Sequence, residues 1–242
     1  MEGSRTNAAR LWAGSADAYI AFEDAGDRNR TDLLDPVMLA ECGDVSQQDV
    51  LDVGCGEGRF TRMLNDRGAR CTGVDATPAM VQTARARGGG TYAAAAAEAL
   101  PFRDATFDLA ASYVVLVDVV RYADAIRECA RVLRPGGRLI AANLGFVTAS
   151  QGWVRDEAGN RLHLRVDRYA DEFSQVYEWV GIRIENWHRP LANYMRAYLD
   201  AGLVLRNFLE PVPADQSLRD DPYTEDWFRV PLFNVMRWQK PA

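Results

Sequence analysis

Three glycines and one carboxylate are spaced as a nucleoside-binding site requires. The segment Val50-Leu-Asp-Val-Gly-Cys-Gly-Glu-Gly58 is a short apolar strand that runs into a glycine loop. A loop with few Cβ atoms can turn tightly and let a ligand approach its backbone, and a helix that starts behind it offers unpaired N–H groups to a polar ligand end. Asp75 ends the next predicted strand, where a carboxylate can accept hydrogen bonds from both hydroxyls of an adenosine ribose.

Two other interpretations of the glycine loop exist. A glycine-rich turn without any ligand is common, and a dinucleotide-binding loop would have the spacing G-x-G-x-x-G. Here the third glycine comes one residue early, and Arg59 occupies the place of the last glycine. The strand before the loop, the helix after it and Asp75 together favour a ligand site over a plain turn. The spacing disfavours a dinucleotide.

Candidate proton acceptors are few, because the chain contains only two histidines. His188 precedes Pro190 and a predicted helix, so we expect it to border the pocket as a catalytic base; the alternative is a capping or core histidine. His163 lies on a predicted hairpin, which favours a surface or lid role. Asp118 follows an apolar strand at the edge where open α/β sheets place their active-site loops, with a helix N-cap as the alternative.

The segment 145–188 is rich in aromatic residues and arginines, and we interpret it as a lid over the substrate. Clustered aromatic side chains suit a planar or apolar acceptor, although they could equally form the core of the lid or a dimer contact. Arg155, Arg165 and Arg168 could bind an acidic acceptor, or could simply be solvated. The aromatic residues are Trp153, Tyr169, Phe173, Tyr177, Trp179 and Trp187.

The periodicity of apolar residues indicates how these groups are positioned. Strands are predicted at 50–53, 70–74, 92–96, 107–116 and 138–143, with helical segments between them, and this alternation is typical of a parallel sheet. An Ala-rich helix over 5–20 and a polar loop over 23–32 are predicted before the first strand. After the predicted strand at 138–143, the sequence predicts a hairpin around 156–160 and a helix at 190–201. Further strands are predicted at 177–187, 203–209 and 228–238.

Composition excludes several classes of protein. The net charge is −6 over 242 residues and the pI is about 5.1, which disfavours binding to a nucleic-acid backbone. No apolar stretch is long enough to span a membrane, and no leader of the secretory type is visible. The four cysteines form no C-x-x-C pair, so no metal site is expected. We therefore expect a cytoplasmic protein.

Four ordered motifs over residues 45–144 resemble the class I S-adenosylmethionine-dependent methyltransferases that act on small molecules. Besides the glycine loop, they are Gly73-Val-Asp-Ala-Thr-Pro-Ala-Met80, Glu98-Ala-Leu-Pro-Phe102 with Phe107-Asp-Leu109, and Arg131-Val-Leu-Arg-Pro-Gly-Gly137. The later segment Asn186-Trp-His-Arg-Pro-Leu191 resembles a subset of that family. Trp12, Tyr19 and Gly26-Asp-Arg-Asn-Arg30 are similar to its cofactor-covering segment.

The resemblance implies a fold. It is an α/β, Rossmann-like sheet of seven mostly parallel strands in the order 3-2-1-4-5-7-6, with strand seven antiparallel and a lid inserted after strand five. The chain would be one domain, with cofactor-covering helices at 1–40, a cofactor-binding core at 45–144, the lid at 145–188 and a final helix and strands at 189–242.

The resemblance also implies which residues hold the cofactor, S-adenosyl-L-methionine, and its product S-adenosyl-L-homocysteine. The glycine loop would hold the methionine part, Asp75 the ribose, and Tyr19 with Arg30 the methionine carboxylate. Ser112 and Tyr113 would lie next to the reactive methyl, with Tyr113 also a catalytic candidate. The other implied contacts are Asp52, Gly54, Cys55 and Gly56 at the methionine, and Ala76, Met80, Ala97 and Glu98 at the adenine. Ala96 departs from the family, which usually has an acidic residue there.

The function implied is methyl transfer to an oxygen, nitrogen or carbon of a small-molecule acceptor by in-line displacement. A secondary metabolite is the expected acceptor. One alternative is a tRNA methyltransferase, which would need a basic face from Arg155, Arg161, Arg165 and Arg168. Others are a non-catalytic cofactor-binding protein, and an NAD enzyme that the loop spacing disfavours. A homodimer through the lid is a further expectation.

Overall fold

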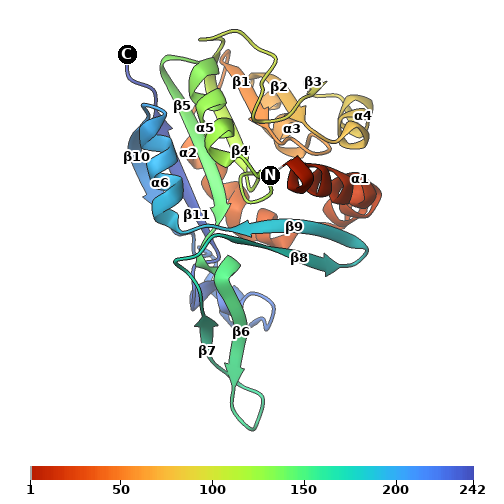
Figure 1. Ribbon diagram of the computed structural model, residues 1–242, viewed down its shortest axis with the longest axis vertical. Coiled ribbons are helices and arrows are strands. Elements are labelled where there is room, and N and C mark those ends of the chain that lie inside the picture. Colours follow the sequence, from red (N-terminus) through yellow and green to blue (C-terminus); the bar gives the residue numbers. More distant parts are fainter. Residues whose placement is uncertain (1) are drawn as a thin grey trace.

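The computed structural model describes the backbone of residues 2–242 and the side chains from residue 7 onward. A seven-stranded sheet forms its centre, with strand order β10-β11-β5-β4-β1-β2-β3 (Figure 1). β11 runs antiparallel to both β5 and β10, and the other neighbours are parallel. The fold and strand order implied by the resemblance are therefore confirmed. The strands are β1 Asp49–Val53, β2 Arg70–Asp75, β3 Thr91–Ala94, β4 Phe107–Tyr113, β5 Leu133–Leu144, β10 Val204–Leu209 and β11 Phe233–Gln239.

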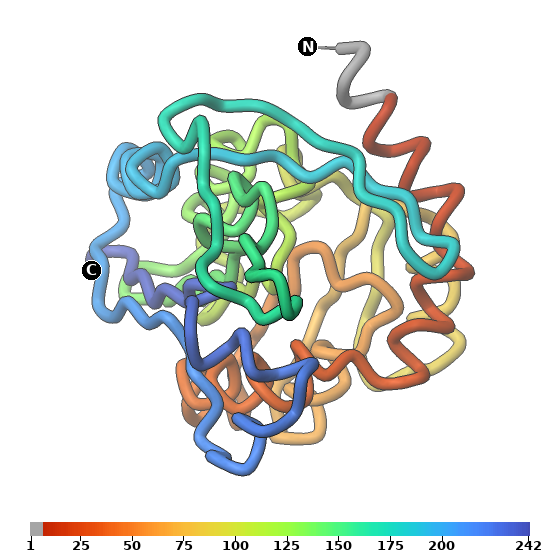
Figure 2. The backbone as a smooth tube through the Cα atoms, turned by 90° about the horizontal axis from the view of Figure 1, so that it is seen from below, coloured from red at the N-terminus to blue at the C-terminus, as the bar shows by residue number. Residues whose placement is uncertain are grey.

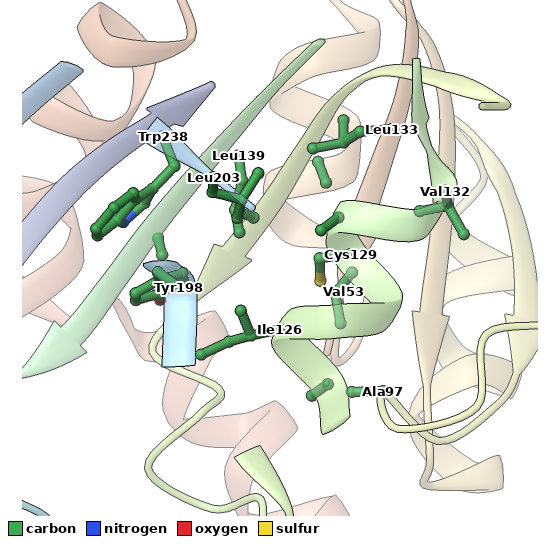
Figure 3. Close-up of a cluster of buried hydrophobic side chains, with 14 of the residues drawn as sticks. Val53, Ala97, Ile126, Cys129, Val132, Leu133, Leu139, Tyr198, Leu203 and Trp238 are labelled. Carbon is green, nitrogen blue, oxygen red and sulfur yellow. The ribbon is translucent and has the colours of Figure 1, made fainter. Parts of the chain in front are cut away.

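Helices cover both faces of the sheet, because central strands buried on two sides need apolar cover on each. On one face, α5 (Tyr122–Val132) and α6 (Leu191–Asp200) pack into a core that includes Ile126, Tyr198 and Trp238 (Figure 3). On the other face, α2 (Asp35–Cys42) and α3 (Arg59–Asn65) contribute Met38 and Leu64 to a second core. α4 (Pro78–Arg87) packs against β2 and β3.

Several helices and strands begin or end at other residues than the sequence predicts. The predicted strand at 107–116 stops at Tyr113, because Val114 takes a left-handed φ of 58°. The segment 23–32 is not one polar loop: α1 (Glu2–Ala25) runs through its start, and a π-helical turn (Asn29–Leu34) leads into α2. The predicted strand at 228–238 begins at Phe233, after a 3-10 turn at Glu225–Phe228.

The predicted strand at 177–187 was wrong. It is a hairpin of β8 (Phe173–Trp179) and β9 (Ile182–His188), joined at Val180 and Gly181. Both turn residues have positive φ, 40° and 84°. This geometry suits Gly and Asn, whereas a β-branched valine is rarely found there, so the residue types concealed the turn.

The segment 145–188 therefore holds two hairpins. β6 (Ser150–Arg155) and β7 (Arg161–Val166) form the predicted one, which extends away from the sheet (Figure 1). The β8–β9 hairpin crosses the carboxyl ends of the central strands and runs beside α1 (Figure 2). No helix among the described residues is long and apolar enough to cross a membrane.

Candidate active site

A cavity of about 480 Å³ lies at the carboxyl ends of the central strands, beneath α1. Its volume is within the range of small-molecule and cofactor sites. Most of the predicted cofactor residues meet there. The lining residues are Ala8, Ala9, Trp12, Tyr19, Arg30, Gly54, Gly56, Asp75, Ala76, Thr77, Met80, Ala95, Ala96, Ala97, Glu98, Tyr113, Val114, Val115, Asp118, Val119 and Val120.

The glycine loop forms the floor of the cavity, and two of its glycines are needed for different reasons. Gly54 and Gly56 both have left-handed φ values, 70° and 54°. A Cβ on Gly54 would lie 2.5 Å from the methyl carbons of Val115, whereas a Cβ on Gly56 would meet nothing within 4 Å. At position 54 a side chain is excluded because Val115 occupies the space. At position 56 the space is open, so a ligand can approach the backbone there.

Asp75 lies at the end of β2, as predicted, and its carboxylate is fixed by two backbone groups. One oxygen accepts from the Gly56 amide at 3.0 Å and the other from the Thr77 amide at 2.8 Å. Burial raises the pKa of this carboxyl. Because a carboxylate oxygen can accept more than one hydrogen bond, each oxygen can still accept one from a ligand hydroxyl. This is the arrangement that two adjacent ribose hydroxyls require.

A wall of small apolar side chains follows Asp75. Ala76, Met80 and the chain from Ala95 to Ala97 line it, and Glu98 is at its end. These side chains leave a slot that suits a flat heterocycle. The predicted contacts Ala76, Met80, Ala97 and Glu98 all line the cavity, and Ala96 adds only its backbone and methyl group.

The predicted Tyr19–Arg30 pair borders a small recess of about 40 Å³ next to the main cavity. The guanidinium of Arg30 donates to the Tyr19 hydroxyl at 2.6 Å, pairs with Glu23 at 2.9 Å and lies 4.7 Å from the centroid of the Tyr113 ring. Asp52 and Cys55 line the recess but not the main cavity. Asp52 accepts from the Thr61 hydroxyl at 2.6 Å, and burial raises its pKa to about 6.

Tyr113 and Ser112, predicted beside the reactive methyl, differ in position. The ring of Tyr113 lines the cavity, but its hydroxyl donates to Asp35 at 2.9 Å, and burial raises its pKa. That hydroxyl is therefore committed to Asp35. Ser112 is 1% exposed and lines neither the cavity nor the recess.

Asp118 is the ionisable group of the cavity that has no part in the predicted cofactor contacts. Burial raises its pKa to about 8, and its carboxylate accepts a hydrogen bond from the side-chain amide of Asn186. Val119 and Val120 flank it on the same wall. A carboxyl group of this kind can exchange a proton near neutral pH.

His188, the other predicted base, does not line the cavity. Its imidazole is 1% exposed and both ring nitrogens are engaged: Nε2 lies 2.9 Å from the Tyr169 carbonyl oxygen and Nδ1 lies 2.6 Å from the Thr148 hydroxyl. Since a carbonyl oxygen only accepts, Nε2 carries the proton. This is the core-histidine arrangement that the sequence left open.

The aromatic and basic residues of 145–188 do not reach the cavity either. None of the six predicted aromatic side chains lines it; Trp12 on α1 does instead. Arg155, Arg165, Arg168 and His163 are exposed. Several lining residues were not indicated by the sequence. Val114 and Val115 lie in the predicted strand 107–116, and Val119 and Val120 follow Asp118; the others are Ala8, Ala9, Thr77 and Ala95. The described residues hold no cluster of metal ligands.

A glycine cradle, a half-buried carboxylate for a ribose and an alanine-rich wall fit S-adenosylmethionine on a Rossmann-like sheet. The fold and site thus define a class I methyltransferase. Residues 51–141 match the family model described as "Methyltransferase domain". This part of the chain is a class I S-adenosylmethionine-dependent methyltransferase domain, and S-adenosylmethionine is its cofactor.

Individual proteins agree with that assignment. The S-adenosylmethionine-dependent methyltransferase from Mesorhizobium loti superposes with a TM-score of 0.78 at 26% identity, over 89% of this chain and 99% of that one. A malonyl-[acyl-carrier protein] O-methyltransferase of Pseudescherichia vulneris is 37% identical over 58% of this chain and 51% of its own length. A demethylmenaquinone methyltransferase of Tropheryma whipplei is 33% identical over 60% and 62%. The chain thus spans about half to three fifths of these two curated relatives.

Proposed function

We propose that the protein transfers the methyl group of S-adenosylmethionine to a small-molecule acceptor. The observation that carries this proposal is the presence, in one cavity, of the Asp75–Gly56 cradle and a second carboxyl group, Asp118. The first has the geometry for the cofactor ribose. The second remains for the acceptor. Two curated relatives, a malonyl-[acyl-carrier protein] O-methyltransferase and a demethylmenaquinone methyltransferase by name, support an acceptor that is not a nucleic acid.

The cofactor supplies an electrophilic methyl group on a sulfonium. Asp75 and the glycine loop would hold the cofactor, which when bound would supply this methyl group to an oxygen, nitrogen or carbon atom of the acceptor. The protein contributes orientation through Asp75 and the glycine loop, which lowers the entropic part of the barrier. Trp12, Val119 and Val120 keep water out. Asp118 accepts the proton that a hydroxyl or amine acceptor must lose.

His188 has no catalytic role in this proposal, because both its nitrogens are occupied away from the cavity. Tyr113 contributes its ring and not its hydroxyl, which donates to Asp35. The other predicted cofactor contacts that line the cavity or the recess are kept as proposed, and Ser112 is not among them.

The alternative of a tRNA methyltransferase is disfavoured by the contacts of three of its four candidate arginines, two on the β6–β7 hairpin and one just after β7. Arg161 pairs with Asp226 at 2.9 Å, and Arg168 pairs with Asp171 at 3.0 Å. Arg155 donates to the Gly159 carbonyl of its own turn. A phosphate backbone would have to compete with these partners.

Calorimetry with S-adenosylmethionine, S-adenosylhomocysteine and NADH tests the cofactor. We expect binding of the first two and not of NADH. Asp75→Ala removes the ribose acceptor and should weaken binding by about 2 kcal/mol, roughly thirtyfold, while Asp66→Ala, an exposed acid on the same domain, should leave it unchanged. Equal affinities in both variants would remove Asp75 from the site.

Transfer of a labelled methyl group to a panel of hydroxyl, amine and carbon acceptors, with bulk tRNA as a parallel sample, tests the acceptor. Incorporation into a small molecule and not into tRNA supports the proposal. Cofactor binding without transfer to any sample would favour the non-catalytic alternative. The secondary-metabolite role and a cytoplasmic location stay predictions.

The homodimer also stays a prediction. Leu162 and Val166 on β7 are exposed, at 52% and 39%, and they are the apolar surface that such a contact would use. Light scattering of the wild type and of Leu162→Ser would test it: a dimer that this substitution converts to monomer supports a contact through the hairpin.

A further inference from the structure

The 114–120 loop forms the wall of the cavity that carries Asp118, and its conformation is strained at the start. Val114 has a φ of 58°, a value that is rare and unfavourable for a β-branched residue. Such a conformation persists only when surrounding contacts hold it. Within the loop, the Val114 amide continues the ladder to the Ala142 carbonyl, and the Asp118 amide donates to Val115. The other ties come from a distant segment.

Three residues of the segment 186–189 hold this loop by hydrogen bonds. The side chain of Asn186 donates to the Asp118 carboxylate, and the Trp187 amide donates to the Val117 carbonyl at 2.8 Å. Arg189 then donates to the carbonyls of Leu116 at 3.0 Å, Val119 at 2.8 Å and Val120 at 3.3 Å. One planar guanidinium, with its donors in a rigid fork, thus bridges both sides of Asp118.

Arg189 is buried to an unusual degree for an arginine, at 4% exposure. Among the described residues it forms no ion pair; its charge faces those carbonyl dipoles, the Tyr194 hydroxyl at 3.1 Å and the rings of Tyr122 and Trp187, at 4.4 and 5.1 Å. Burying a cation without a carboxylate partner is costly. An apolar residue could fill the same space, so the burial of a charge here calls for a reason beyond packing.

We propose that Arg189 is a positioning residue for methyl transfer, which acts by fixing the 114–120 loop and thereby the place and ionisation of the Asp118 carboxyl. This proposal rests on the proposed function, in which Asp118 accepts the acceptor's proton. Arg189 itself lines neither the main cavity nor the recess, so it would act through Asp118.

The charged groups around Asp118 come from three other elements. Asp75 from β2 raises its pKa, while Arg189 and, from the N-terminal segment, Arg30 lower it; Asn186 from β9 lowers it by hydrogen bonding. Removing the Arg189 charge therefore moves the Asp118 midpoint upward, and releasing the loop exposes Asp118 to water, which moves it downward. Replacement by methionine and by lysine separates the two effects, because lysine keeps the charge but lacks the fork.

The test is a pH titration of the protein labelled at the aspartate side-chain carbonyl carbon, with Asp118→Asn identifying the Asp118 signal. Wild type, Arg189→Met and Arg189→Lys are compared. Arg196→Met, an exposed arginine one turn into α6, is the matched control. We expect the Asp118 midpoint to move downward in Arg189→Lys, which keeps the charge but releases the loop, and to lie higher in Arg189→Met than in Arg189→Lys. The control should leave the midpoint in place.

Calorimetric affinity for S-adenosylhomocysteine is measured in parallel, and we expect it to change by less than about threefold, because the ribose cradle is untouched. With an acceptor in hand, kcat should fall by about tenfold or more at unchanged cofactor affinity. An Asp118 midpoint that is the same in folded Arg189 variants and wild type would overturn the proposal, even if the variants are less stable.

Should the Arg189 variants not fold, Asn186→Ala and wild-type hydrogen exchange replace them. Slow exchange of the Trp187 and Asp118 amides in wild type, together with a moved Asp118 midpoint in Asn186→Ala, supports a held loop; fast exchange overturns it. Failure of the proposed function is recognised separately, as absence of S-adenosylhomocysteine binding by wild type, while the titration still reports on Arg189 and Asp118.

Discussion

Ser15 on α1 is joined twice to Arg183 on β9: its hydroxyl donates to the Arg183 carbonyl at 2.9 Å and accepts from the Arg183 amide at 2.9 Å. The serine thereby occupies the free edge of the β8–β9 hairpin as a further strand residue would. A second tie joins Asn7 to Glu185 at 2.9 Å. Because α1 also supplies Trp12 and Tyr19 to the cavity, this joint fixes α1, and with it part of the cavity wall, to the hairpin.

Ser15→Ala breaks this joint. It leaves a carbonyl and an amide of Arg183 without their partner, and should lower the free energy of unfolding by about 1–3 kcal/mol. Because α1 then orders less readily over the cavity, affinity for S-adenosylhomocysteine should fall on the order of fivefold. Calorimetry and hydrogen exchange of the α1 amides measure both effects. Asp17→Ala, on the exposed side of the same helix, is the control; an equal loss in both variants would count against the joint.

The raised pKa of Asp118 should make both the stability and the turnover of the protein depend on pH. Its folded-state pKa of about 8 lies above that of an ordinary carboxyl, so the folded chain binds more protons than the unfolded chain between these values. The stabilisation from the protonated form is complete below the unfolded pKa and is lost as pH rises through about 8. Asp118→Asn should therefore show a flatter decline of unfolding free energy between pH 5 and 8, measured by urea denaturation.

Asp52, Asp75 and Glu23 also have raised pKa values, and their contribution is shared by wild type and variant. The difference between the two curves is thus specific to Asp118, and parallel curves would contradict a raised pKa. Turnover, which needs the ionised form as base, should rise with pH toward 8 in wild type and lose that dependence in Asp118→Asn.

His188→Ala is predicted to act on stability and not on the site. It removes two hydrogen bonds and a ring packed between Tyr169 and Phe173, at centroid distances of 5.3 and 5.0 Å. The free energy of unfolding should drop by about 2–4 kcal/mol, and affinity for S-adenosylhomocysteine should stay constant. Thr148→Val, which loses one of the two bonds, should cost less. A large loss of turnover in a fully folded His188→Ala would restore the histidine as a base.

The sequence predicted those parts of the site that follow from chain direction alone. The carboxyl ends of parallel strands share one edge, so Asp75 and the glycine loop had to meet once β1 and β2 were identified. His188 could not be placed in this way, because its hydrogen-bond partners, Tyr169 and Thr148, lie in other parts of the segment 145–188. The β8–β9 hairpin was itself hidden by a valine in a left-handed turn.

Arg189 shows a second limit of prediction from sequence. Its partners are backbone carbonyls of residues 116–120, about seventy positions earlier in the chain. Carbonyl groups are the same in every residue and leave no trace in the residue types. The motif Asn186-Trp-His-Arg-Pro-Leu191 could thus be noticed, but what it holds became visible only when β9 was seen against the 114–120 loop.

Two alanine substitutions in the glycine loop should affect different properties, one mainly the stability of the protein and the other mainly its affinity for the ligand. Both sites require left-handed φ, which costs an alanine about 1 kcal/mol. In Gly54→Ala the new methyl group also collides with Val115, so the protein should lose about 2–4 kcal/mol of unfolding free energy. In Gly56→Ala the methyl enters the open space of the cavity, so stability should fall only by the φ cost while affinity for S-adenosylhomocysteine drops about tenfold or more. Thermal unfolding and calorimetry on the two variants distinguish these outcomes, and a Gly56→Ala protein that binds as tightly as wild type would mean that the ligand lies elsewhere.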